Sequence, residues 1–230
     1  MSKPANAVML GLAVVILVGL AAGCQQPGMA GAEPHPEALS EMVQPAEGGI
    51  FIAEKHFVVN WLLLGPFKFE AEKFKGDQQQ DATDYEFVKN EAALDGSQEA
   101  PEGTKWQAKR FAVAAGADAG QIDLDELYGA PEYAAAYAVA WIKCPEAMDK
   151  LKLRVGSDDY IKIWINGKHV HTYKEKRRAS DWDQDVVQNV SLKKGVNRIV
   201  VKCVDVVFDW DFYLRFTDAA DKAIALKQPK

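Results

Sequence analysis

The sequence predicts an all-β fold, a β-sandwich, for most of this chain of 230 residues. Short runs rich in Val, Ile, Tyr and Trp recur with turn residues between them, a pattern typical of sandwiches. Asn166-Gly167 separates two alternating runs and predicts a two-residue hairpin, because both central positions of a type I′ turn need positive φ. The sequence shows no alternation of strands with long amphipathic helices, which excludes a parallel α/β fold.

The expected elements begin at residue 57. A β-rich run covers Phe57 to Leu64 and is ended by Gly65-Pro66. Residues Lys68 to Thr104 are polar and poorly periodic, which predicts a long excursion with one short strand or helical turn near 85–88. Ile122 to Tyr128 predicts either a short strand or a helical turn. The other strands are expected at 106–113, 134–142, 150–155, 160–165, 169–174, 186–192, 198–205 and 210–216.

Two features indicate which of these side chains are buried. Ile199-Val200-Val201 is apolar without alternation, which predicts a central strand covered on both faces. Trp141 and Trp164 lie within alternating strands, and we expect them to pack in the core or against a sheet face.

Residues 1–23 predict a secretory signal peptide. Lys3 gives a basic start, residues 8–20 are apolar or glycine, and small residues precede Cys24. This order resembles the lipobox of bacterial lipoproteins, which implies cleavage before Cys24 and acylation of that residue. Gln25 follows Cys24. Outer-membrane lipoproteins lack Asp at this position, so the resemblance implies anchoring to the outer membrane.

A retained transmembrane anchor is the alternative, because the apolar stretch is close to the roughly 20 residues that cross a bilayer. Either interpretation places the rest of the chain outside the cytoplasm. Residues 24–48 are rich in Pro, Ala and Gly and predict a flexible tether. The sandwich is expected at 49–218, followed by a C-terminal tail at 219–230.

The formal net charge of −6 argues against nucleic acid as a partner, because phosphate binding needs a basic surface. The basic cluster at 174–178 is interpreted as a solvated loop. The sequence contains no P-loop, His-Glu-x-x-His, Gly-x-Ser-x-Gly or Gly-x-Gly-x-x-Gly motif, so we expect a protein that is not an enzyme. His169 and His171 share a face of their strand and are either a metal-binding pair or exposed hairpin surface.

Two cysteines lie on strand faces that are predicted to be buried. Cys144 shares a face with Ile142, and Cys203 shares one with Ile199 and Val201. In the oxidising compartment of an exported protein they can form a disulfide, and two buried free thiols are the alternative. Neither has a His or Cys neighbour at metal-ligand spacing, which argues against zinc.

Six stretches in order resemble a known family: WLLLGPF at 61–67, AYA at 136–138, VGSDDYIKIWINGK at 155–168, DQDV at 183–186, LKKGVNRIVVK at 192–202 and WDFYLR at 210–215. This set is similar to galactose-binding-like and PA14-like jelly-roll modules of bacterial envelope proteins. The resemblance implies a jelly-roll β-sandwich, and some relatives of this kind bind sugars.

Ser157-Asp158-Asp159 is the first candidate site. Some PA14-like lectins bind Ca²⁺ through an Asp-Asp pair, so the resemblance implies a calcium site at Asp158 and Asp159. Carboxylate oxygens are the ligands that this hard cation prefers. The alternative is a turn in which the Ser and Asp side chains cap backbone N–H groups.

Tryptophans flanked by carboxylates form the second candidate site. Aromatic faces stack on sugar rings while carboxylates accept hydrogen bonds from hydroxyls. This pattern predicts Trp182 and Trp210 as exposed sugar platforms, with Asp181, Asp183 and Asp211 as ligand-binding residues. In an extended segment, Asp181, Asp183 and Asp185 would share one face and Trp182 would lie on the other. A solvated acidic loop is the alternative.

The sequence therefore predicts a lipid-anchored, exported binding module for glycans or envelope polymers, assisted by Ca²⁺. The alternative is a structural subunit of the cell envelope that docks onto a partner protein, with Lys68 to Thr104 as its docking arm.

Overall fold

The computed structural model of the chain describes residues 56–74, 76–111 and 119–224. Cys24, the predicted signal peptide and tether, and residues 225–230 of the predicted tail lie outside the described residues. Within the described ranges, no helix is long and apolar enough to span a bilayer.

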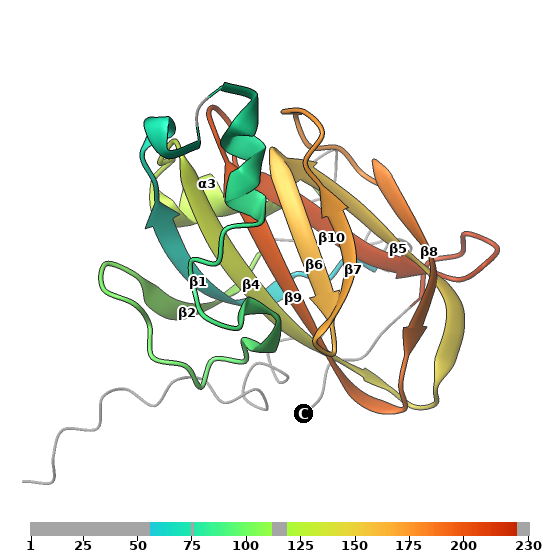
Figure 1. The fold of residues 1–230 in the computed structure, drawn as a ribbon. Helices are drawn as coiled ribbons and strands as arrows, with labels where there is room; N and C mark the ends of the chain where they lie inside the picture. The colour runs from blue at the N-terminus through green and yellow to red at the C-terminus, as the bar shows by residue number, and fades with distance from the viewer. Residues whose placement is uncertain (1–55, 75, 112–118, 225–230) are drawn as a thin grey trace, which may run out of the picture. The chain divides into compact units, whose positions relative to one another are not determined.

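Two antiparallel sheets pack face to face, which confirms the predicted all-β sandwich (Figure 1). The larger sheet has the order β2 (Lys105–Arg110), β1 (Asn60–Lys68), β4 (Ala134–Cys144), β9 (Gly195–Asp205), β6 (Tyr160–Ile165) and β7 (Lys168–Tyr173). The smaller sheet has the order β3 (Ile122–Asp123), β10 (Asp211–Thr217), β5 (Met148–Asp158) and β8 (Asp185–Leu192). Helix α3 (Leu124–Tyr128) follows β3 directly, so 122–128 contains both predicted alternatives.

The core between the sheets combines small and large side chains. The inner face of β4 carries Ala134, Ala136, Ala138 and Ala140, all buried. Aromatic rings from both sheets fill the adjacent space, and the centroids of Trp61 and Phe212 are 5.2 Å apart. This complementarity of volumes is what a close-packed interior requires.

A second core lies on the other face of the larger sheet (Figure 1). The excursion forms three short 3₁₀ helices, η2 (Ala71–Phe74), η3 (Gly76–Thr83) and η4 (Glu91–Ala93). Its buried residues Phe74, Val88 and Leu94 pack with outer-face residues of the sheet, among them Trp141 and Trp164. The sequence predicted an excursion with one short strand or helical turn near 85–88; the structure has helical turns at 71–74, 76–83 and 91–93 instead, and the excursion packs against its own sheet.

This cover explains the apolar run in β9. Ile199 and Val201 belong to the core between the sheets, whereas Val200 belongs to the second core. The strand is therefore buried on both faces, as the sequence predicts.

One buried ion pair fastens the excursion to the sheet. Lys202 on β9 is fully buried, and its Nζ donates to Glu91 Oε2 at 2.7 Å and to the Tyr85 carbonyl at 2.9 Å. The Tyr137 hydroxyl on β4 donates to the same Glu91 oxygen at 2.7 Å. Burial lowers the pKa of Lys202, and the charge and hydrogen bond of Glu91 oppose that shift. Burial and the Glu91 charge raise the pKa of Tyr137.

The structure confirms one predicted turn and corrects another. Asn166 and Gly167 have φ of 52° and 80° and connect β6 to β7, which confirms the predicted hairpin. β1 does not end at Gly65-Pro66 but continues to Lys68. Pairing with β2 stops at Gly65, and the β4 register shifts between Leu64 and Phe67, so Pro66 lies where a missing N–H is tolerated.

The predicted disulfide is wrong. Cys144 and Cys203 are buried free thiols, the alternative that the sequence left open. In the β4–β9 ladder, Cys144 pairs with Gly195 and Cys203 pairs with Ala136. The two thiols therefore lie near opposite ends of the ladder, separated by roughly 26 Å at the rise of a strand. A disulfide needs Cα atoms within about 7 Å.

We predict that Glu91→Leu lowers the free energy of unfolding by about 3–5 kcal/mol, because it leaves the Lys202 ammonium buried without its countercharge. Equilibrium urea unfolding measures the change. The double variant Glu91→Leu/Lys202→Met should lose much less than the single variant, since it removes both charges. Glu102→Gln, at an exposed position of the same excursion, is the control. A loss for Glu91→Leu as small as that of this control would contradict the role of the pair.

Candidate cation and ligand site

Two of the connections between the sheets meet at one end of the sandwich. The first crossing joins β5, which ends at Asp158, to β6, which begins at Tyr160. The second joins β9, which ends at Asp205, to β10, which begins at Asp211. The crossings are held together because Asp158 pairs with Asp211 and the Asp159 N–H donates to the Val204 carbonyl at 3.2 Å.

Three carboxylates meet where the crossings touch. Asp158, Asp159 and Asp205 are only 5%, 2% and 1% exposed, and each offers an oxygen within 4.8 Å of the others. The Asp159 carboxylate accepts from the backbone N–H groups of Val206 at 3.1 Å and Arg178 at 3.2 Å. In contrast, Asp205 Oδ1 is buried and has no hydrogen-bond partner among the described residues. A buried carboxylate oxygen without a partner is costly, so this atom points to a missing ligand.

Like charges and burial disfavour ionisation of this cluster. Burial and the nearby carboxylates of Asp159 and Asp125 raise the pKa of Asp205 to about 8. Burial, followed by the charge of Asp159, also raises the pKa of Asp158. Burial raises the pKa of Asp159 as well, although the Val206 N–H and the Arg177 charge oppose that shift. A bound divalent cation would relieve this repulsion, which makes the cluster a candidate metal site.

Arg178 lies in the loop between β7 and β8 and holds this loop beside the three carboxylates. Its guanidinium donates to both oxygens of Asp185 at 3.0 and 2.6 Å and to the Ser157 carbonyl at 3.2 Å, and it stacks 3.4 Å from the ring centroid of Tyr173. The backbone of this loop approaches β5 so closely that a Cβ at Gly156 would lie 1.8 Å from the Asp181 carbonyl oxygen. The basic cluster at 174–178, interpreted from sequence as a solvated loop, therefore has a structural role at Arg178.

Asp185 is the common partner of Arg178 and His171. His171 Nε2 lies 3.0 Å from Asp185 Oδ2, whereas His169 Nε2 lies 2.7 Å from Thr172 Oγ1. The two histidines thus turn to different partners and do not converge on one metal. Burial would raise the pKa of Asp185, but hydrogen bonds from His171 and Arg178 lower it to about 2.

A cavity of about 620 Å³ opens onto two of the three carboxylates, Asp158 and Asp159. Phe208 stands at its mouth with 80% of its surface exposed and with φ of 80°, a conformation that non-glycine residues rarely adopt. Residues in such backbone conformations cluster at ligand-binding sites, which makes Phe208 a candidate ligand-facing residue. The lining comprises Asp125, Ala130, Asp158, Asp159, Arg177, Arg178, Ala179, Val207, Phe208 and Asp209.

The two tryptophans predicted as exposed platforms are not exposed platforms. Trp210 is fully buried in the core between the sheets, because it precedes β10 in phase with the inward-facing Phe212. Trp182 is half-buried and packs against that core, with its ring centroid 5.8 Å from that of Phe57. The exposed aromatic ring at this edge is Phe208, which the sequence analysis missed.

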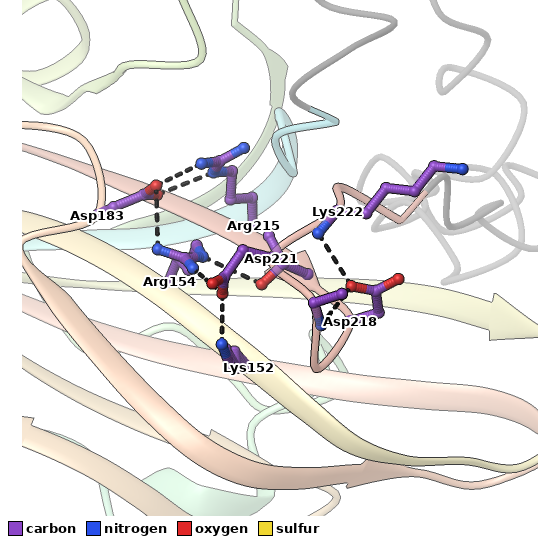
Figure 2. A network of polar contacts seen from close by, with 9 residues as sticks. Lys152, Arg154, Asp183, Arg215, Asp218, Asp221 and Lys222 are labelled. Atoms are coloured by element: carbon purple, nitrogen blue, oxygen red, sulfur yellow. Dashed lines mark hydrogen bonds and ion pairs between the residues drawn. The ribbon is translucent and has the colours of Figure 1, made fainter.

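The acidic residues beside these tryptophans also have other roles. Figure 2 shows Asp183 between Arg154 of β5 and Arg215 of β10, and Arg215 Nε donates to it at 2.8 Å. Asp181 is exposed, and its Oδ1 accepts from the Trp182 N–H at 2.7 Å. Residues 181–184 form a turn rather than a strand, so Asp181, Asp183 and Asp185 do not share one face.

Asp211 lies near the carboxylate cluster but is satisfied by protein groups. Its oxygens accept from Gln121 Nε2 at 2.9 Å and from the Ser180 hydroxyl. Burial raises the pKa of Asp211 to about 6, and these two hydrogen bonds limit the rise. Of the predicted site residues, only Asp158 and Asp159 line the cavity.

The sequence analysis missed Asp205, Asp125 and Phe208. One signal was available: Asp205 ends an apolar strand, and Phe208 follows in a short loop that leads to the next strand. That pattern marks a loop at a sheet edge, where ligand sites are common. It does not reveal that this loop meets the Asp158-Asp159 crossing.

A comparison with models of protein families gave no match, and neither did a comparison with curated proteins. Among solved structures, the chain is similar to the PA14 sugar-binding domain of an RTX adhesin, at 12% identity and a TM-score of 0.40 over 75% of this chain and 100% of that chain. It is also similar to the PA14 domain of the MpAFP antifreeze protein, at 17% identity and a TM-score of 0.31 over 73% of each chain. A family 35 carbohydrate-binding module from an environmental isolate matches at 17% identity and a TM-score of 0.27, over 40% of this chain and 72% of that chain. These are the kinds of module that the sequence motifs resemble, and at such identities and TM-scores they carry no conclusion about a ligand.

We predict that Asp185→Asn lowers the free energy of unfolding by about 2 kcal/mol near neutral pH, and that this difference disappears in acid. Because folding lowers the pKa of Asp185 to about 2, its contribution is present above the unfolded pKa near 4 and is lost as the pH falls toward 2. Urea unfolding of both proteins across this range measures the difference. Glu175→Gln, at an exposed position in the same loop, is the control. A difference that stays constant from neutral pH to pH 2 would contradict the assignment.

Proposed function

We propose that this protein is an exported glycan-binding module that uses a divalent cation, calcium by its chemistry, held by Asp158, Asp159 and Asp205. The observation that carries the proposal is the buried, unpartnered Oδ1 of Asp205, on a carboxylate that offers an oxygen within 4.8 Å of oxygens of the other two. Protein sites that bury like charges without compensation are rare, and a cation is the simplest compensation.

The chemistry of the residues fits calcium. Ca²⁺ takes six to eight oxygen ligands, and carboxylates are its principal protein ligands. No His or Cys side chain joins the three carboxylates in this cluster, and an all-oxygen set favours Ca²⁺ or Mg²⁺ over zinc or copper. When bound, calcium supplies positive charge and open coordination positions for sugar hydroxyls.

The residues around the cluster supply the rest of a sugar site. The exposed ring of Phe208 offers a face on which the apolar side of a pyranose can stack. Arg177 and Asp209 line the same cavity and offer a donor and an acceptor to ligand hydroxyls. A rigid pocket floor with one aromatic wall is a common design for small-ligand sites.

We predict that calcium raises the melting temperature of the protein and supports binding on a glycan array, and that EDTA abolishes both effects. Calcium at 100 times its dissociation constant adds about 2.7 kcal/mol of stability, which corresponds to several degrees. Asp158→Asn and Asp205→Asn should lose the calcium-dependent shift. In EDTA near pH 8, Asp205→Asn should melt at or above the temperature of the wild-type protein, because it removes a buried charge.

Matched variants separate the cation site from the sugar platform. Phe208→Ala should keep the calcium-dependent shift and lose glycan binding, whereas Val196→Ala, an exposed apolar position near the start of β9, should keep both. Asp149→Asn, an exposed carboxylate near the start of β5, should also behave as wild type. An unchanged melting temperature with calcium, together with no glycan bound in any condition, would refute the proposal.

We also propose that a lipid on Cys24 holds the module at the cell envelope, with residues 24–48 as a tether. The support is the order of residues before Cys24, which resembles a lipobox. Two or three acyl chains suffice for stable anchoring, since each buried methylene contributes about 0.8 kcal/mol.

For the anchor we predict that bacterial cells expressing the full chain incorporate labelled palmitate into it, and that the protein sediments with membranes. Cys24→Ser should abolish the labelling, whereas Cys144→Ser, at a buried position of the sandwich, should keep it. Equal labelling of the Cys24→Ser variant and the wild-type protein would exclude Cys24 as the acylated residue.

A further inference from the structure

Acidic side chains outnumber basic ones in the lining of the cavity. Asp125 and Asp209 line it beside Phe208, and neither forms an ion pair among the described residues. The two carboxylates are close enough that the charge of Asp209 contributes to the raised pKa of Asp125, after burial and alongside Asp123. A third acidic residue, Glu132, adds to the potential around Asp205.

The balance of charge remains negative even with a cation in place. A divalent ion and Arg177 together offset the three charges of Asp158, Asp159 and Asp205. Arg178 is already neutralised by its two hydrogen bonds to Asp185. Asp125 and Asp209, which line the cavity together with Phe208, then carry two charges that no ion pair of the described residues offsets.

We infer that this site selects glycans that carry a protonated amine, such as polymers with free glucosamine units, over the same glycans in neutral or acidic form. The inference rests on the proposed function. Phe208 would stack on the apolar face of the ring, while Asp125 and Asp209 would accept charge-assisted hydrogen bonds from the ammonium group. Such bonds are roughly twice as strong as neutral ones.

The backbone geometry fixes one acceptor of the pair. One oxygen of Asp125, Oδ2, accepts from the Trp210 N–H at 2.9 Å, which orients the carboxylate at the start of α3. Trp210 itself is fully buried, so this contact ties Asp125 to the core. Asp209 is exposed in the same short loop as Phe208 and can adjust to the ligand.

The test compares three oligosaccharides with the same β-1,4 backbone, built from glucose, N-acetylglucosamine or glucosamine. Calorimetric titration uses the full chain in mild detergent with saturating calcium, at mildly acidic pH where the sugar amine is protonated. We expect the glucosamine oligomer to bind about tenfold more tightly than the other two, with a preference that weakens as salt screens the charges. Asp209→Asn should reduce the preference about fivefold, and Asp125→Asn/Asp209→Asn should abolish it, while both keep the calcium-dependent melting shift.

The remaining outcomes distinguish this inference from the proposed function. Asp149→Asn serves as the control for loss of one exposed carboxylate and should keep the full preference. Equal affinity for the three oligomers, a preference that survives in the double variant, or binding of none of them by a protein that still responds to calcium overturns the selectivity alone. If calcium shifts nothing and no glycan binds at all, the proposed function fails as well.

Discussion

Lys202 is fully buried on the outer face of β9, and Glu91 of the excursion supplies its countercharge at 2.7 Å. An unpaired ammonium there would cost several kcal/mol. The Lys202 side chain can therefore be buried only when the excursion brings Glu91 to it. The excursion in turn covers the outer faces of β9, which ends at Asp205, and of β6, which begins directly after Asp159. The two strands that adjoin the candidate site are therefore held rigidly, because both of their faces are packed.

That rigidity is needed because the carboxylate cluster works against folding. Three acidic side chains within 4.8 Å of one another repel when ionised, and burial strengthens the repulsion. The protein compensates with contacts that surround the cluster without neutralising it. Arg178 binds the neighbouring loop through Asp185 and Ser157, and backbone N–H groups satisfy Asp159. These surrounding contacts thus stabilise the cluster, and Asp205 Oδ1 is left available for a ligand.

Local sequence signals predicted local structure well. The Asn166-Gly167 hairpin, the alternating inner face of β4 and the apolar run in β9 were all correct, because each depends on residues a few positions apart. Predictions that needed a register or a crossing were wrong or incomplete. Cys144 and Cys203 belong to the same core but lie near opposite ends of the β4–β9 ladder. Asp205 is 46 positions from Asp159 in the chain, and only the sandwich topology brings them together.

Phe208 and Trp210 show how little separates a structural residue from a ligand-facing one. They lie two positions apart in one short loop, yet Trp210 is fully buried and Phe208 is 80% exposed. The difference arises because the loop has to return to β10 with Phe212 facing inward, which also turns Trp210 inward. Phe208 precedes that constraint, and its positive φ directs the chain away from the core. Composition alone would favour the tryptophan as the exposed ring, whereas the phase of the following strand buries it and leaves the phenylalanine exposed.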